Sequence, residues 1–256
     1  MIKIGAQMYT VRDFCRTPED IEASLKKIAA MGYRYVQYSG CGYIEPAKLK
    51  EICDGLGLRV IITHTPYDRI VKETEAVIAD HAAMGCGYIG LGSMPDWARN
   101  DRAGLERFFE EIAGPVQKIR AAGMQFGYHN HSFEFVKIEG ERLFDRLFRR
   151  FAPEELGIIM DTYWIQHGGG DLYQWIEKAA GRLTCVHLKD MGMRSDGRQH
   201  MEAVGDGNLN FAAILPAFER AGAEYAFVEQ DDCNGEDPFV CLGRSLAYLR
   251  ELGYAE

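Results

Sequence analysis

Three apolar segments of the sequence each end in a side chain that can bind a metal ion or carry a proton. GIIMD ends at Asp161, TCVH ends at His187, and AFVE ends at Glu229. A fourth apolar segment, MQF, leads into residues 127–135, GYHNHSFEF, which hold two histidines and a glutamate. Carboxylates with imidazoles suit Mn²⁺, Mg²⁺, Co²⁺ or Zn²⁺, and an oxygen-rich set favours the harder ions. Any one of these residues alone is more often half of an ion pair, so the chemistry depends on whether the fold brings them together.

A short repeated pattern suggests how the fold does so. The pattern is the end of a helix, a glycine suited to the left-handed position that closes a helix, and then an apolar strand. Its copies are AAMGYRYVQY, AAMGCGYIGL, RAAGMQFGYH and RAGAEYAFVE, with GLGLRVIITH as a looser one. Amphipathic stretches with helical spacing lie between the copies. The sequence therefore repeats the αβ half of a βαβ unit.

Eight strands are predicted, each followed by a helical segment. They cover residues 3–11, 33–39, 58–64, 88–93, 124–131, 157–164, 183–189 and 225–230. This number predicts an α/β fold, a single-domain TIM (β/α)8 barrel over residues 1–256, with its active site at the carboxyl ends of the strands. An open doubly wound sheet is the alternative, but it usually has fewer strands and a glycine-rich phosphate turn, which this sequence lacks. The longest irregular segment, residues 191–210, follows the seventh strand, and a loop of that length is usually functional.

In a barrel, the four polar segment ends belong to the fifth, sixth, seventh and eighth strands. Adjacent strands lie about 4.8 Å apart, so the four ends can surround one ion. His129 and His131 have the same parity on their strand and face the same side, as Lys189 does with His187. These residues are therefore expected beside the ion or a substrate.

Composition excludes several classes of partner. The formal net charge is −9, and no basic cluster is longer than RLFRR, which argues against nucleic acid. The seven cysteines are odd in number and form no CxxC pair, as in reduced cytoplasmic proteins. No apolar run has the length of a signal peptide or a membrane span. We expect a soluble cytoplasmic protein without a membrane partner.

The segments MDTYW, VHLKDM, GDGNLNF, FVEQD and YHNHSFEF resemble the xylose isomerase-like TIM barrel family of sugar phosphate isomerases and epimerases. This group includes ketose 3-epimerases, hydroxypyruvate isomerases and inosose dehydratases. The resemblance covers essentially the whole chain, and it is specific for fold and metal but poor for substrate. It implies one divalent cation, manganese among the candidates, held by the last four strands. Dimers or tetramers are common among the relatives, so a homo-oligomer is also expected.

The resemblance assigns three metal ligands directly, namely Asp161, His187 and Glu229. Many relatives carry Glu-Asn-His at the end of the fifth strand, where this chain has His129, Asn130 and His131. Either Glu134 reaches back from the loop to complete the metal site, or His129 takes the place of the glutamate. We favour Glu134.

The resemblance also implies roles in catalysis and substrate binding. His64 matches a histidine that contacts the substrate, and Lys189 matches a lysine that contacts the substrate or stabilises negative charge. Glu134 and Glu229 can each be ligand or base, Lys189 or His131 can be the acid, and His129 can contact the substrate.

Two residues depart from the family pattern. Gln37 ends the second strand, where many isomerases have a glutamate, and Trp164 stands where ketose epimerases have a histidine. Trp164 is one of five aromatic residues expected near strand ends as a wall for a sugar; the others are Tyr9, Tyr67, Trp97 and Phe133. His81 and His167 are expected on a helix surface and in a loop.

The expected function is a metal-dependent isomerase or epimerase of a small carbohydrate or keto-sugar, working through an enediolate. The alternative is a lyase or dehydratase that acts on an inosose or a 3-keto-glycoside, because the same site can expel a β-substituent. An apurinic-site endonuclease shares the fold, but the acidic charge counts against it. A barrel that binds sugar without turnover is the fourth reading.

Overall fold

Eight parallel strands close into a barrel in the order β1-β12-β9-β8-β5-β4-β3-β2. The structure is a computed structural model and describes residues 1–255. The barrel strands are β1 (Lys3–Gln7), β2 (Tyr35–Tyr38), β3 (Arg59–His64), β4 (Tyr88–Leu91), β5 (Gln125–His129), β8 (Gly157–Asp161), β9 (Leu183–Leu188) and β12 (Tyr225–Val228). Each lies within one of the eight predicted segments, so the predicted TIM barrel is confirmed. Residues 8–11 and 162–164 differ from the prediction: they belong to helices that begin directly after β1 and β8.

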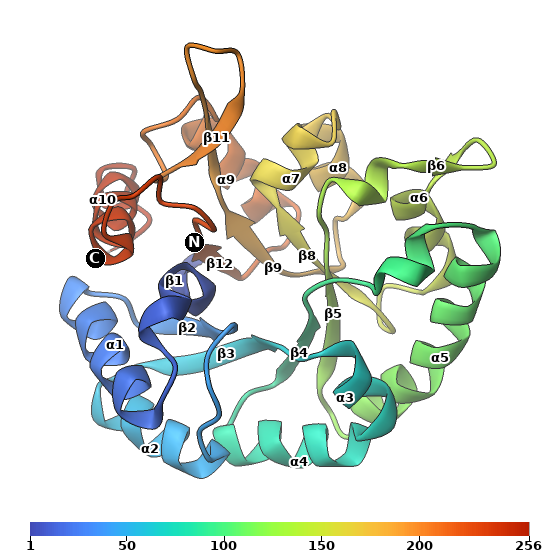
Figure 1. Cartoon of the computed structure of the whole chain (residues 1–256), viewed down its shortest axis with the longest axis horizontal. Helices are drawn as coiled ribbons and strands as arrows, with labels where there is room; N and C mark the ends of the chain where they lie inside the picture. The colour runs from blue at the N-terminus through green and yellow to red at the C-terminus, as the bar shows by residue number, and fades with distance from the viewer. Residues whose placement is uncertain (256) are drawn as a thin grey trace.

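Helices surround the barrel (Figure 1). They are α1 (Pro18–Met31), α2 (Pro46–Gly55), α3 (Tyr67–Lys72), α4 (Thr74–Met84), α5 (Arg102–Ala121), α6 (Leu143–Arg150), α7 (Thr162–His167), α8 (Leu172–Lys178), α9 (Phe211–Arg220) and α10 (Pro238–Glu251). The repeated pattern explains their ends. Helix α1 begins with a capping box between Thr17 and Asp20, and it ends at Gly32, whose φ of 110° favours glycine. Gly85 closes α4 in the same way with φ 69°. Among the residues described, no helix is long and apolar enough to cross a lipid bilayer.

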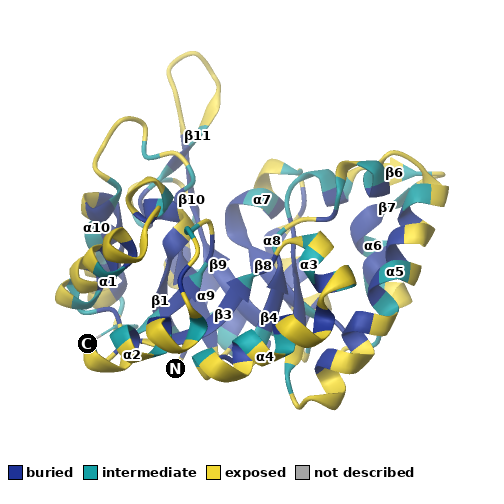
Figure 2. Cartoon of the chain, turned by 60° about the horizontal axis from the view of Figure 1, so that its bottom comes forward, coloured by how far each residue is buried: buried dark blue, intermediate teal, exposed yellow. Residues whose placement is uncertain are grey.

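The strands are buried on both faces, as Figure 2 shows in dark blue. Their outer side packs against the helices in one large apolar core. Inside the barrel a smaller cluster forms, including Ile159, Cys185 and Phe227, each exposed by no more than 1%. Each of these lies two residues before a polar strand-end residue and faces the same side. The cluster therefore forms an apolar layer directly beneath the strand-end side chains.

The sequence predicted an irregular segment after β9. Part of this segment instead forms an antiparallel hairpin. Strands β10 (Asp190–Met193) and β11 (Gln199–Glu202) pair with Met191 opposite Met201. The turn residue Gly197 has φ 83°, which a glycine adopts without strain. The hairpin projects from the barrel, and its tip is exposed (Figures 1 and 2).

Asp190 fastens the base of this hairpin. Its buried carboxylate accepts backbone N–H bonds from Met191, Gly205, Gly207 and Leu209, at 2.7, 2.9, 3.0 and 3.1 Å. The chain on both sides of the hairpin is thus tied to the end of β9.

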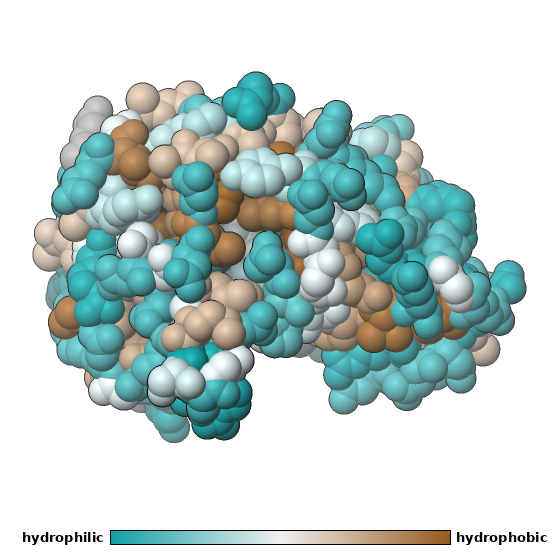
Figure 3. Space-filling view, turned by 90° about the horizontal axis from the view of Figure 1, so that it is seen from above, coloured by the Kyte–Doolittle hydropathy of each residue, from teal (hydrophilic) through white to brown (hydrophobic). Residues whose placement is uncertain are grey.

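The surface seen in Figure 3 is covered mainly by hydrophilic residues. Hydrophobic residues show between them as separate patches. Scattered patches of this kind are ordinary on a folded domain, and they do not define a docking surface on this face. Ligand sites are therefore expected in the cavities and not on this outer face.

Candidate metal centre

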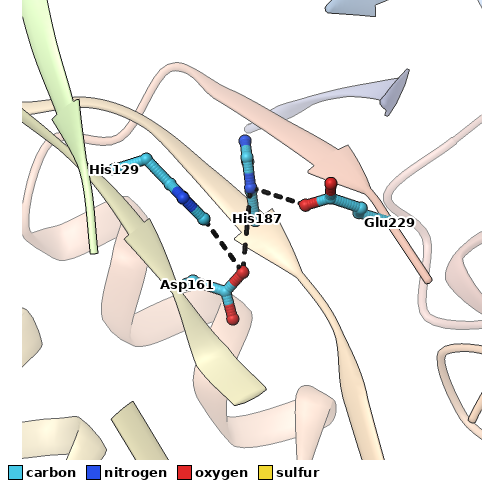
Figure 4. A group of neighbouring side chains, drawn as sticks. All are labelled: His129, Asp161, His187 and Glu229. Carbon is cyan, nitrogen blue, oxygen red and sulfur yellow. Dashed lines mark hydrogen bonds and ion pairs between the residues drawn. The ribbon is translucent and has the colours of Figure 1, made fainter. Parts of the chain in front are cut away.

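Four strand-end side chains meet at the carboxyl end of the barrel. His129 ends β5, Asp161 ends β8, His187 lies in β9, and Glu229 follows β12. One ligand atom from each lies within 4.8 Å of the others, and all four residues are buried. Figure 4 shows the side chains pointing toward one another from four neighbouring strands. The predicted convergence of the last four strands is therefore present.

Each of the two imidazoles has a hydrogen-bond acceptor on the side away from the cluster. His129 Nδ1 lies 3.1 Å from the carbonyl oxygen of Gly92, and His187 Nε2 lies 2.8 Å from Oε1 of Gln37. A neutral ring donates its single N–H to such an acceptor, which leaves a lone pair on the other nitrogen. In this tautomer His129 Nε2 and His187 Nδ1 could bind a cation, and without one each can instead carry a proton toward the carboxylate beside it. Gln37, which the sequence analysis treated as the loss of an acid or base, thus orients a candidate ligand.

The two carboxylates approach these nitrogens closely. Oδ2 of Asp161 lies 3.2 Å from His129 Nε2, and Oε2 of Glu229 lies 2.8 Å from His187 Nδ1. His187 Nδ1 has no other partner within hydrogen-bond distance, whereas Glu229 Oε2 also lies 2.9 Å from Nζ of Lys189. The second oxygen of Asp161, Oδ1, accepts the backbone N–H of Trp164 at 2.9 Å and so begins helix α7. Two nitrogen and two oxygen donors that converge in this way fit a divalent cation.

Burial sets the charges around the cluster. It lowers the pKa of His64, His129 and His131, the last to about 2, so these rings are neutral. Burial also acts to lower the pKa of His187, but the charges of Glu229 and Asp161 outweigh it, and the pKa of His187 is raised. A bound cation would compete with a proton for this ring.

Lys189 lies buried beside the cluster. Its Nζ lies 3.2 Å from Asp161, 2.9 Å from Glu229 and 3.0 Å from Asp231. Burial alone would lower the pKa of Lys189, but the three carboxylates raise it, so the ammonium stays charged. The same contacts, against the opposing effect of burial, hold the pKa values of Asp161 and Glu229 below the usual range.

Glu134, the favoured fourth ligand, lies outside this cluster. Glu134 lies in the 3-10 turn η3 (Phe133–Phe135), which directs its side chain away from the cavity. The side chain is fully buried. Its carboxylate accepts the hydroxyl of Tyr128 at 2.5 Å and the backbone N–H of His131 at 2.7 Å. Tyr128 has the opposite strand parity to His129 and belongs to the outer core. We favoured Glu134 as the fourth ligand, but in this structure it is His129 that lies beside Asp161, His187 and Glu229; which residue binds a metal stays a prediction.

A cavity of about 500 Å³ opens above the cluster. It is lined by six residues that the sequence analysis selected, namely His64, His129, His131, Trp164, Lys189 and Glu229. Tyr9 and Tyr67 of the expected aromatic wall also line it. Trp97 instead packs edge-on against Tyr67, and Phe133 stacks on His131 at 5.3 Å between ring centroids.

Two residues at the site were missed. Asp231 lines the cavity, and burial together with Glu229 raises its pKa to about 6. It follows Glu229 by two residues, so strand parity could have indicated it. Asn130, the middle residue of His-Asn-His, accepts the backbone N–H of Asp161 at 3.1 Å and fixes the end of β8 beside β5. No sequence signal separated that role from a role in binding.

Comparison with known proteins agrees with this architecture. A family model described as xylose isomerase-like TIM barrel matches residues 25–252. An inosose dehydratase of Geobacillus thermodenitrificans (strain NG80-2) is 29% identical over 146 residues, which are 50% of this chain and 48% of that protein. The match thus spans about half the length of this curated relative.

Solved structures share the whole fold. A sugar phosphate isomerase/epimerase from Parabacteroides distasonis ATCC 8503 superposes with a TM-score of 0.83 at 23% identity, over 100% of this chain and 96% of the other. An L-ribulose 3-epimerase superposes with a TM-score of 0.75 at 17% identity, over 98% and 94% of the two chains. At these identities the likeness shows the fold. Because the family model covers most of the sequence, the chain belongs to the xylose isomerase-like TIM barrel family.

Proposed function

We propose that this protein is an enzyme that binds one divalent metal ion through His129, Asp161, His187 and Glu229. It would act on a small carbohydrate or keto-sugar by removing the proton next to the carbonyl group. The observation that carries the proposal is the meeting of two oriented imidazole lone pairs and two carboxylates at the base of the cavity. A bound cation supplies positive charge that stabilises the negative charge developing on the substrate oxygens.

Residues of the protein itself would supply the base and the groups that stabilise charge and contact the substrate. Glu229 lines the cavity and is the carboxylate base, since Glu134 is shielded from the cavity in the outer core. Lys189 holds a positive charge beside the cluster and stabilises an enediolate. Glu229 then carries the proton and delivers it to the product, while His131, whose ring is neutral and whose Nδ1 has no partner in the protein, hydrogen-bonds the substrate from just beyond β5. Return to a different atom gives an isomerase, and return to the other face gives an epimerase.

His64 contacts the substrate in this proposal. Its ring lies against those of His129 and His187, with centroid distances of 5.1 and 5.5 Å. Its Nε2 has no hydrogen-bond partner in the protein, although the residue lines the cavity. A neutral imidazole can donate or accept a hydrogen bond, so His64 suits a sugar hydroxyl.

Elimination is the second candidate, and a specific observation favours it. Epimerisation needs two proton-transfer groups on opposite faces of one carbon, but Gln37 and His129 stand where two glutamates are expected. Elimination needs one base and one acid for the leaving group, which Glu229 and either His131 or Lys189 would supply. The similarity to an inosose dehydratase agrees with such a reaction.

Incubation of the Mn²⁺-loaded protein with ketoses, inososes and 3-keto-glycosides in D₂O tests the proposal. Isomerisation or epimerisation gives a new isomer that contains deuterium, whereas elimination gives an enone that absorbs in the ultraviolet. We expect Asp161→Asn to lose both bound metal and turnover, and Asp196→Asn, at the exposed hairpin turn, to keep both. Full turnover by chelator-treated wild-type protein would contradict the metal-dependent function.

A further inference from the structure

A second cavity, of about 370 Å³, adjoins the one above the metal centre. It lies between strand β11, helix α7 and the segment that follows β12. Trp164 and Asp231 line both cavities, so the two meet at these residues. We call the second one the hairpin cavity. Each of the two is within the range of about 300–1,000 Å³ that is usual for small-ligand sites.

The hairpin cavity has an apolar floor and a polar rim. Tyr163 and Met201 pack together with Trp164 in a separate apolar cluster, and the Tyr163 and Trp164 rings lie 5.0 Å apart, edge to face. The rim includes Gln199 and His200 of β11. An aromatic floor that packs against a ring, with polar groups around it that fix its orientation, is the composition of a site for a sugar.

Several buried polar atoms around the two cavities have no hydrogen-bond partner in the protein. They are Nε1 of Trp164, Nδ1 of His131, Nδ1 of His200 and one carboxylate oxygen, Oδ1, of Asp231. Buried polar groups are normally paired, because an unpaired one costs free energy. The set contains a donor, an acceptor and two imidazoles that can be either. Hydroxyl groups both donate and accept, so a polyhydroxylated ligand is the chemistry that satisfies the whole set.

The charges do not suit a phosphate group. Lys189 is the one lysine or arginine among the described residues that line the main cavity, and it already contacts three carboxylates. In the hairpin cavity, Arg198 is held by both of its contacts with Asp196, at 2.8 and 2.6 Å. Arg194 donates to Asn234 at 2.9 Å. In the main cavity a phosphate would find no lysine or arginine that carboxylates do not already contact, and in the hairpin cavity it would find at most Arg194, whose hydrogen bond goes to a neutral amide.

We propose that the substrate is an unphosphorylated, oxidised glycoside with a second sugar ring. The ring that reacts occupies the main cavity, and the second ring occupies the hairpin cavity on the Tyr163 and Met201 floor. The linkage between the rings passes Trp164 and Asp231. The assignment of the reacting ring rests on the proposed function, whereas the assignment of a second sugar site rests on the hairpin cavity alone.

Binding of unoxidised sugars tests the second site without turnover. Calorimetry on the Mn²⁺-loaded protein compares glucose, galactose and xylose with their α- and β-linked disaccharides and with glucose 6-phosphate. We expect at least one disaccharide to bind ten-fold or more tightly than its parent monosaccharide, and glucose 6-phosphate to bind no better than glucose. Gln199→Trp fills the hairpin cavity and should remove the advantage of the disaccharide without changing monosaccharide binding. Ser195→Trp, at the exposed turn of the same hairpin, is the matched control and should change neither.

The proposal is overturned if no disaccharide binds more tightly than its monosaccharide, or if glucose 6-phosphate is preferred. It is also overturned if Gln199→Trp and Ser195→Trp behave alike. Failure of the proposed function would look different, since a protein without metal-dependent turnover could still show the disaccharide preference and lose it in Gln199→Trp.

Discussion

Glu134 gives a sharp test of how burial acts at this end of the barrel. The side chain is fully buried, and burial raises its pKa from the ordinary 4.5 to about 7, although it accepts hydrogen bonds from Tyr128 and His131. Below pH 4.5 the carboxyl is protonated in both the folded and the unfolded protein. Between pH 4.5 and 7 the unfolded protein releases the proton while the folded protein keeps it, so stability falls as the pH rises.

The size of the effect follows from the two pKa values. They differ by about 2.5 pH units, and at 1.36 kcal/mol per unit this gives about 3 kcal/mol. Glu134→Gln keeps the shape and an acceptor for His131, but it does not titrate. The free energy of unfolding of Glu134→Gln, minus that of the wild type, should therefore rise by about 3 kcal/mol from pH 4.5 to pH 8.

Urea denaturation of both proteins at half-unit pH steps measures this difference, and other titrating groups cancel in it. Glu111→Gln, a change at a glutamate that is only partly buried, is the control and should not show the rise. A flat difference, or a fall with increasing pH, would refute the reasoning that burial dominates over the two hydrogen bonds. Glu134→Gln should also keep one bound Mn²⁺, since His129 and not Glu134 lies in the cluster. Loss of the metal in Glu134→Gln would return Glu134 to the set of expected ligands.

Three further outcomes are expected. Gln37→Leu removes the acceptor for His187 Nε2 and should weaken Mn²⁺ binding about 10- to 100-fold in a chelator competition, whereas Gln166→Leu, at an exposed position of helix α7, should not. Asp190→Ala leaves four backbone N–H groups without their acceptor and should lower the free energy of unfolding by about 3 kcal/mol or more. Proteolysis after the hairpin should become faster, while Asp196→Ala should change the free energy of unfolding little. Chelation of the metal should lower the melting temperature, and Mn²⁺ at about 100 times its dissociation constant should raise the free energy of unfolding by about 2.7 kcal/mol. No change with added Mn²⁺ would mean that the cluster binds no ion.

The barrel could be predicted because the sequence repeats one local unit. A glycine at a helix end and an apolar strand after it are neighbours in the chain, so this local pattern marks five of the eight strands, and an apolar run marks each of the other three. Asp161, His187 and Glu229 followed from this, because the ends of parallel strands gather at one side of a barrel. Their metal-binding role remains a prediction.

The choice between His129 and Glu134 could not be made from the sequence. It depends on a three-residue turn that directs one side chain out of the barrel, and the letters FEF permit either direction. The hydrogen bond between Gln37 and His187 joins residues 150 positions apart, and no local sequence pattern predicts it.

His81 shows the same limit, because it was expected on a helix surface. It is buried instead, and its ring bonds to Thr63 at 2.8 Å and to the carbonyl of Val77 at 2.7 Å. The neighbours of a helix are set by how it packs against the barrel, so helical spacing alone did not reveal this position.

The apolar layer of Ile159, Cys185 and Phe227 has a kinetic consequence. It closes the barrel below the strand-end side chains, so a molecule bound at the candidate metal centre can enter and leave only through the carboxyl end. Substrate and product then share one route and exclude each other from it. If the site turns over a substrate as we propose, leaving product would compete with incoming substrate, and turnover at high product concentration would be limited by how quickly that single opening is cleared.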